Sequence, residues 1–187
     1  KGYTTQLTVL YLFALYAAKQ LKTVDNAAFH QYLSTLKSLP KLIQQALDMN
    51  TGMVHLAKKY HSACSMFFIG RNTDYAVALE GALKMKEISY IHAESYAAGE
   101  LKHGTIALIC EGQPVIALCC NEAITEKTMS NIVEVKARGA EVLAVAFRDN
   151  AKIVSLADDM LYIPKIHRIN LEDLHQHLEH RPKYEQY

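Results

Sequence analysis

The sequence has no excess of charge of one sign and no basic stripe. Its 187 residues contain 20 lysines and arginines against 19 aspartates and glutamates, which leaves a formal net charge of +1. This balance argues against binding of nucleic acid or of an anionic membrane surface by bulk electrostatics. Half of the residues are hydrophobic and 21% are charged, a composition typical of a globular domain with a substantial core.

Long hydrophobic runs are also missing. The strongly apolar stretch from Leu7 to Ala18 covers only a dozen residues, too few to cross a bilayer, and it lacks a charged leader and a cleavage site. We therefore expect a buried core helix within residues 4–22, and a cytoplasmic protein. Because the chain begins at Lys1 inside this predicted helix, we expect it to be a piece of a longer protein.

Cysteine and glycine motifs that would indicate a bound metal or nucleotide are absent. The four cysteines, at positions 64, 110, 119 and 120, have no CxxC spacing, which argues against a zinc site. We expect reduced, mostly buried thiols. The glycine that ends the first predicted strand, Gly70, is not followed by a GxGxxG pattern, which argues against a dinucleotide. No cofactor is expected.

Short apolar runs alternate with amphipathic segments after about residue 60. This alternation of apolar and amphipathic segments predicts an α/β three-layer sandwich with a parallel, doubly wound sheet, preceded by an N-terminal helical arm. The predicted strands are residues 65–70, 114–120, 141–147 and 160–163. The predicted helices of the sheet region are residues 74–90 and 122–139, with Gly139 as the C-cap.

The arm is predicted to continue over residues 27–49 as one or two helices, with Asn26 as N-cap and an interruption before Pro40. We expect the domain boundaries to give an arm, a sheet domain and a divergent polar tail, at residues 1–50, 51–166 and 167–187.

Three charged residues in the helix over residues 74–90 form the main candidate site. Glu80, Lys84 and Glu87 are spaced four and three apart, so they lie on one face of a helix. Lys84 can keep Glu87 ionised, as a general base requires. The alternative is a surface ladder of ion pairs without chemistry. Another side of this helix, with Leu79, Ala82, Leu83 and Tyr90, is predicted to be buried.

Histidines offer further candidates. His103, which precedes Gly104 on a predicted loop, is suited to proton transfer. His92 is predicted to lie near a helix end with a structural or capping role. His175, His177 and His180 in the tail lack a carboxylate or cysteine placed to complete a metal site, so a polar terminus is the preferred interpretation and no metal is expected.

The runs EGALKMKEISYIHAE, from Glu80 to Glu94, and YAAGELKHG, from Tyr96 to Gly104, closely resemble the isomerising glutamine–fructose-6-phosphate aminotransferases, or glucosamine-6-phosphate synthases. The similarity covers roughly residues 1–164. It implies the second sugar-isomerase (SIS) domain, with five parallel strands between helices. The family converts fructose 6-phosphate and glutamine-derived ammonia into glucosamine 6-phosphate.

The resemblance also implies roles for individual residues. Glu87 matches the base that moves a proton between C1 and C2 of the sugar, and Lys84 matches its neighbouring lysine. His103 matches the histidine assigned to ring opening, which in the family reaches the site from the partner subunit of a dimer. The implied partner is a phosphosugar substrate, without a metal or organic cofactor.

The chain departs from the family in several places. It lacks the glutaminase domain and most of the first SIS domain, which carries the phosphate loop, and Thr4 and Thr5 are not assigned to phosphate. Thr105 replaces a proline, and Lys183 does not match the family's tail lysine. We expect the piece alone to be inactive. Two other hypotheses compete with this one. The chain could instead be an SIS module that binds phosphosugars without converting them, or a structural fragment that serves only in dimerisation.

Overall fold

The structure, a computed structural model, describes residues 2–48 and 50–165, which form two compact units on either side of residue 45. Its elements, in chain order, are α1 (Gly2–Gln20), α2 (Asn26–Asp48), α3 (Asn50–Tyr60), β1 (Ser65–Gly70), α4 (Thr73–Ser89), β2 (His92–Ala97), the 3-10 helices η1 (Ala98–His103) and η2 (Thr105–Leu108), β3 (Pro114–Cys119), the 3-10 turn η3 (Glu122–Ile124), α5 (Thr125–Lys136), β4 (Glu141–Phe147), α6 (Ala151–Val154) and β5 (Asp159–Ile163). The expected domain boundaries stay a prediction, and the tail lies outside the described residues.

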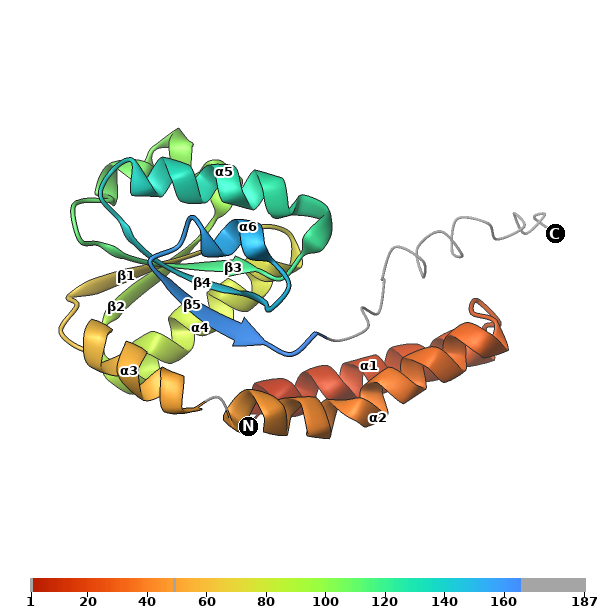
Figure 1. The fold of residues 1–187 in the computed structure, drawn as a ribbon. Helices are drawn as coiled ribbons and strands as arrows, with labels where there is room; N and C mark the ends of the chain where they lie inside the picture. Colours follow the sequence, from red (N-terminus) through yellow and green to blue (C-terminus); the bar gives the residue numbers. More distant parts are fainter. Residues whose placement is uncertain (1, 49, 166–187) are drawn as a thin grey trace. The chain divides into compact units, whose positions relative to one another are not determined.

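Five parallel strands form the centre of the second unit, in the order β2-β1-β3-β4-β5 (Figure 1). Helices α3 and α4 cover one face of this sheet, and α5, η1 and α6 cover the other. The predicted α/β three-layer sandwich with a doubly wound sheet is confirmed.

The core is built from strands that are apolar on both faces. Phe67 and Ile69 of β1 pack with Ile132 of α5, whereas the alternate residues Met66 and Phe68 pack on the α3 and α4 side. Side chains alternate between the faces of a strand, so a sheet covered on both sides needs continuous apolar runs. This is the pattern that allowed four of the strands to be predicted.

The fifth strand, β2, was missed by pattern analysis, although the family resemblance implied five strands. His92, predicted near a helix end, is the first residue of β2 and pairs with Ser65. Only Ala93 of this edge strand is fully buried. An edge strand with one buried residue carries no apolar run, and its signal is therefore weak.

The flank of α4 that was predicted to be buried is buried at Ala82 but not at its three larger residues. Ala78 and Ala82 face the sheet, whereas Leu79, Leu83 and Tyr90 are exposed. The helix lies close to β1, since a Cβ placed on Gly81 would be only 3.0 Å from the ring of Phe68. Small residues permit this close approach, and the larger leucines are therefore left on the outer side.

Helix α5 begins later than predicted, at Thr125, after the 3-10 turn η3. It also ends earlier than predicted, at Lys136 with Ala137 as its C-cap, and Gly139 closes the turn that follows. Gly139 has φ of 86°, and its N–H donates to the carbonyl of Lys136 at 2.9 Å. Glycine adopts this left-handed conformation without strain.

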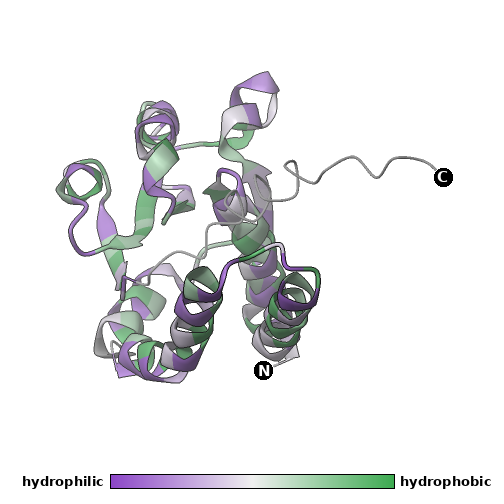
Figure 2. Cartoon of the chain, turned by 90° about the vertical axis from the view of Figure 1, so that its right-hand side faces the viewer, coloured by the Kyte–Doolittle hydropathy of each residue, from purple (hydrophilic) through white to green (hydrophobic). Residues whose placement is uncertain are grey.

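Helices α1 and α2 of the first unit pack through a small cluster around Leu15, Tyr32 and Leu36. The prediction that α1 is a buried core helix is wrong for this chain. Only Leu15 and Ala18 of α1 are buried, and Phe13 is 67% exposed. Along both helices, hydrophobic residues are interspersed with hydrophilic ones (Figure 2). No helix within the described ranges is long and apolar enough to cross a membrane.

Two local predictions in α2 are also wrong. The helix continues through Pro40 without interruption. Its N-terminal cap is Asp25 rather than Asn26, because the Asp25 carboxylate accepts the N–H of Ala28 at 2.7 Å.

The cysteines divide into two classes. Cys119 is buried and Cys120 is partly buried, and burial raises the pKa of each thiol to about 12. Cys64 and Cys110 are exposed, which corrects the expectation of mostly buried thiols.

A charged network ties α3 to the amino ends of β4 and β5. The ammonium of Lys59 pairs with Glu141 and lies 2.5 Å from the carboxylate of Asp159, which also accepts the hydroxyl of Tyr60 at 2.7 Å. Burial alone would raise the pKa of Asp159, but the hydrogen bonds from Lys59 and Tyr60 outweigh it and lower the pKa below its ordinary value.

Replacing Asp159 by Asn should lower the free energy of unfolding at pH 7 by about 1–3 kcal/mol. The folded-state pKa of Asp159 is depressed, so its stabilising effect is complete above the unfolded value of about 3.9 and is lost as the pH falls through the lower folded value. Urea unfolding at pH 7 and at stepwise lower pH checks this result. The difference between wild type and variant should shrink as the acid range is entered.

Asp149→Asn is the matched control, because this exposed carboxylate pairs with Lys165 at the surface. It should leave stability nearly unchanged. A deficit of Asp159→Asn that stays constant into strong acid would contradict the ionic explanation.

Candidate functional site

The three charged residues predicted to share a face of α4 do so. The Nζ atom of Lys84 lies 2.5 Å from Oε2 of Glu87 and 3.5 Å from Oε1 of Glu80. This stripe lies on the side of α4 opposite Ala78 and Ala82, the residues that face the sheet. The hydrogen bond from Lys84 to the Glu87 carboxylate raises the pKa of the lysine, which keeps the lysine protonated.

In this chain the stripe is open to solvent. The side chains of Glu80, Lys84 and Glu87 are 22%, 45% and 51% exposed. Exposed ion pairs contribute little to stability. In this chain the three side chains form a series of ion pairs at the surface. A role in proton transfer requires that another protein surface covers these side chains.

Apolar side chains lie on both sides of the charged stripe. On a helix with 100° per residue, Val77 and Ile88 fall on one side and Leu79 and Leu83 on the other. All four are exposed, Ile88 by 77%. Clustered apolar side chains at a surface are typical of contact sites with another protein surface. The charged stripe of Glu80, Lys84 and Glu87 is thus flanked on both sides by exposed apolar side chains, which we call the apolar border of α4.

His103 is the last residue of η1, rather than part of an irregular loop. Ala98 and Leu101 of this short helix are fully buried and anchor it to the core beneath α5. The imidazole is 66% exposed, and its Nε2 lies 3.8 Å from a carboxylate oxygen of Glu100. Within the described ranges, the ion pair of His103 is with Glu100, and those of Lys84 are with Glu80 and Glu87, so no ion pair links the imidazole to the charged stripe.

A second polar cluster, His92, Glu94 and Tyr96, was not recognised from the sequence. These alternate residues of β2 share one face of the edge strand, where His92 Nε2 lies 3.3 Å from Glu94 and the hydroxyl of Tyr96 donates to the same carboxylate. The shared hydrogen bond lowers the pKa of Glu94 and raises that of Tyr96 to about 12. The His-x-Glu-x-Tyr alternation was the available signal, but it lay in a segment not predicted as a strand.

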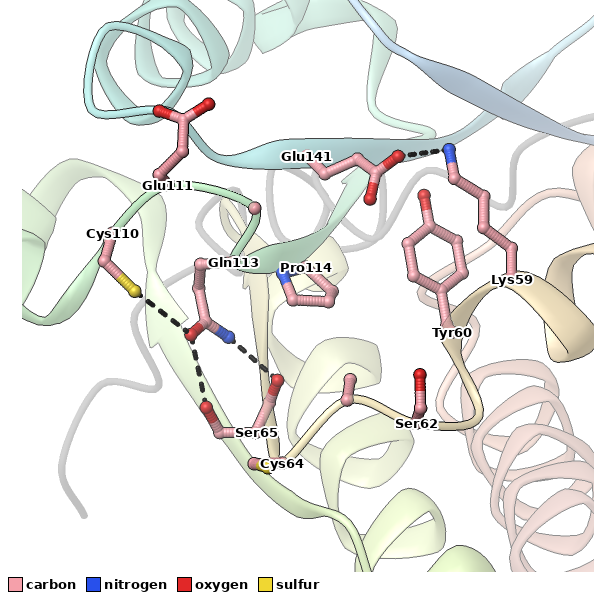
Figure 3. A pocket seen from close by; sticks show the side chains of 12 residues that line it. Lys59, Tyr60, Ser62, Cys64, Ser65, Cys110, Glu111, Gln113, Pro114 and Glu141 are labelled. Carbon is pink, nitrogen blue, oxygen red and sulfur yellow. Dashed lines mark hydrogen bonds and ion pairs between the residues drawn. The ribbon is translucent and has the colours of Figure 1, made fainter.

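A pocket of about 250 Å³ lies at the amino ends of β1, β3 and β4 (Figure 3). Its polar groups mostly satisfy one another. The Gln113 amide donates to the carbonyl of Ser65 at 2.8 Å and accepts the Ser65 hydroxyl at 3.2 Å, and Lys59 pairs with Glu141. In open parallel sheets ligands bind at the opposite, carboxyl ends of the strands. We therefore regard this pocket as structural.

Metal chemistry finds no support in the described part of the chain. Within residues 2–48 and 50–165, no group of three or more His, Cys, Asp and Glu side chains is arranged to hold a metal ion. The three tail histidines fall outside these ranges.

Comparison with known proteins identifies the family. Residues 59–171 match the SIS domain family. The chain is 47% identical over 165 residues to the glutamine–fructose-6-phosphate aminotransferase (isomerising) of Clostridium tetani, an alignment that covers 88% of this chain and 27% of the relative. The chain thus spans about a quarter of the length of such relatives.

Solved structures agree with this match. The C-terminal domain of glucosamine-fructose-6-phosphate aminotransferase from Francisella tularensis superposes with a TM-score of 0.84 at 34% identity, covering 94% of this chain and 49% of that one. The sugar isomerase domain of the RpiR transcription factor from Sphaerobacter thermophilus shares the fold alone, with a TM-score of 0.63 at 13% identity, 79% coverage of this chain and 87% of the other. The chain therefore belongs to the SIS domain family, and within it corresponds to part of the isomerase domain of the isomerising aminotransferases.

Proposed function

We propose that this chain supplies the proton-transfer residues of an isomerising aminotransferase, which converts fructose 6-phosphate and glutamine-derived ammonia into glucosamine 6-phosphate. The observation that carries the proposal is the Lys84–Glu87 pair at 2.5 Å on a helix face bordered by exposed apolar side chains. The similarity to relatives with this activity supports it, and a cytoplasmic location suits such an enzyme.

The chemistry assigns one task to each group. After ammonia has condensed with the C2 carbonyl of the open-chain sugar and water has left, the Glu87 carboxylate removes a proton from C1. The C–H electron pair forms the C1–C2 double bond while the π pair of the C2–N double bond moves to nitrogen. The resulting acid then returns the proton to C2 as the C1 hydroxyl loses its own proton and becomes the aldehyde. Lys84 lies beside this carboxylate and stabilises the negative charge that develops on the sugar. His103 exchanges the proton of the ring oxygen during ring opening. Transfer between adjacent carbons in this way requires neither a metal nor an organic cofactor.

The site is proposed to become complete only in a dimer. Neither the Lys84–Glu87 pair nor the imidazole of His103 is shielded from water in one chain. Covering the apolar border of α4 would remove water from the ion pair and strengthen the interaction. We propose a homodimer in which His103 of one subunit approaches Glu87 of the other, with the phosphate of the sugar bound by parts of the protein beyond this chain.

Mixing two inactive variants tests this arrangement. The test uses a chimera in which this chain replaces the matching 165-residue portion of the Clostridium tetani relative. Glu87→Gln and His103→Asn chimeras should each be inactive. After co-refolding, half of the dimers contain both variants and one intact site each, so about a quarter of the unmodified activity should return.

Co-refolding either variant with itself is the control and should restore nothing. If the mixture also stays inactive while a mixed dimer is demonstrated by differently tagged subunits, the two residues act within one subunit and the proposed arrangement is wrong.

A further inference from the structure

In open parallel sheets a crevice forms at the carboxyl ends of the two strands between which the strand order reverses, and in this sheet those strands are β1 and β3. From β1 the chain continues to β2 on one side, whereas β3 pairs with the other side of β1. In open parallel sheets, ligands bind where the strand order reverses in this way. Backbone N–H groups at strand exits and helix starts provide donors for anions, and phosphates commonly occupy such places.

In this protein a carboxylate occupies the donors of that crevice. Asp74, in the first turn of α4, is only 6% exposed. Its Oδ2 accepts the backbone N–H groups of Cys120 at 2.9 Å and Asn121 at 3.1 Å, the two residues that follow β3. A bound anion would need the same two N–H groups.

The backbone around Asp74 leaves little room for a ligand. Gly70, at the end of β1, lies against the first turn of α4, and a Cβ there would be 2.6 Å from the carbonyl carbon of Asp74. Helix α4 therefore starts directly on the strand end, and this contact directs the Asp74 side chain across to β3.

The cation at this end of the sheet is also engaged. Arg71, which follows β1, donates through Nε to the side-chain oxygen of Asn131 at 3.0 Å, and Asn131 donates in turn to Glu134 at 2.9 Å. The guanidinium lies against Gly99, where an added Cβ would be 3.0 Å from Nη2. Arg71 is thus held between η1 and α5.

We propose that Asp74 is a built-in anion that closes the switch-point crevice of this SIS domain to phosphates and other anionic ligands. The two N–H groups that would bind a phosphate are satisfied by the carboxylate, and its negative charge repels a second anion. Removing the carboxylate while the fold is kept should create a site for a phosphate-sized anion. This inference does not depend on the role of Glu87, and it implies that a sugar phosphate is bound elsewhere in the assembled enzyme.

The test is a titration of the 187-residue chain with inorganic phosphate, followed by the backbone amide signals of Cys120 and Asn121 in two-dimensional NMR spectra. In wild type these signals should not show a saturable shift. In Asp74→Gly they should shift together and saturate, with an apparent affinity at least about tenfold tighter than any response of wild type. Sodium chloride at equal ionic strength controls for screening.

Asp149→Gly is the control variant, since its exposed carboxylate bonds to Lys165 rather than to the β3 exit. It should respond to phosphate as wild type does. A saturable response of the Cys120 and Asn121 amides in wild type would overturn the proposal. So would a folded Asp74→Gly variant whose amides remain unaffected by phosphate.

Should Asp74→Gly fail to fold in buffer without small anions, anion rescue provides the readout. Recovery of a cooperative melting transition with formate or phosphate, but not with chloride, would show that an external anion takes the place of the carboxylate. Failure of both anions to restore folding, under conditions in which Asp149→Gly folds, would contradict the proposal.

Discussion

Replacing Glu87 by Gln is expected to slow exchange of the C1 hydrogen of fructose 6-phosphate with solvent by about 10³-fold. Glutamine keeps the size of the side chain and can still accept a hydrogen bond from Lys84, but it cannot take up the proton. The measurement is loss of deuterium from C1-deuterated fructose 6-phosphate, followed by NMR, in the chimera with the Clostridium tetani relative. Binding of the sugar phosphate should persist, because the change removes the base and leaves the fold intact.

Glu80→Gln in the same chimera is the matched control. Glu80 is the other carboxylate beside Lys84, at 3.5 Å, and it has no proposed part in proton transfer. Its exchange rate should stay within about threefold of the unmodified chimera. An exchange rate of Glu87→Gln close to that of Glu80→Gln would show that Glu87 is not the base, and the SIS module without turnover would then be the better interpretation.

Replacing Gly70 by Ala is expected to cause the largest loss of stability, about 3 kcal/mol, which corresponds to a decrease in melting temperature of roughly 6–12 °C. The added Cβ would lie 2.6–2.8 Å from backbone atoms of Asp74 and Tyr75. Backbone atoms of a helix cannot move aside as the end of a flexible side chain can, so the start of α4 must shift from β1. Differential scanning calorimetry of the sheet unit measures the effect.

Gly52→Ala provides the comparison, because it makes the same chemical change in α3, where an added Cβ meets nothing within 4 Å. That variant should be unchanged or up to about 1 kcal/mol more stable, since alanine favours a helix. Equal melting temperatures for the two variants would contradict the close packing of α4 on β1. A shifted α4 would also displace Lys84 and Glu87, so Gly70→Ala in the chimera should lose activity as well.

Local pattern predicted those parts of the fold in which burial is continuous. Strands β1, β3 and β4 are short, largely buried apolar runs, so composition alone marks them. The edge strand β5 was also predicted from the apolar residues 160–163, although all of its residues are only partly buried. Strand β2 differs, because a single residue, Ala93, is fully buried and the polar residues His92 and Glu94 are exposed. Residue patterning could not recognise it, and only the family resemblance implied a fifth strand.

Helix α1 shows the opposite error. Its nearly uniform hydrophobicity predicted burial on several sides, yet its exposed positions include Leu10 and Phe13. Hydrophobicity indicates a tendency to be buried, but in the part of the chain that the structure describes, α1 is buried only on the side of Leu15 and Ala18. At the start of α2, the carboxylate of Asp25 accepts a backbone N–H. The N-cap is therefore Asp25 and not Asn26, the residue predicted from the sequence.

The sequence by itself determined that Glu80, Lys84 and Glu87 share one side of a helix, because that follows from 100° per residue whatever the surroundings. Only the tertiary structure decided which side of α4 is buried. The sheet accepts small residues such as Ala78 and Ala82 at close range, and the leucines and the charged stripe are therefore left outside. The separation of His103 from Glu87 was likewise decided by packing, because a residue's place on its own element does not specify which other element it will meet.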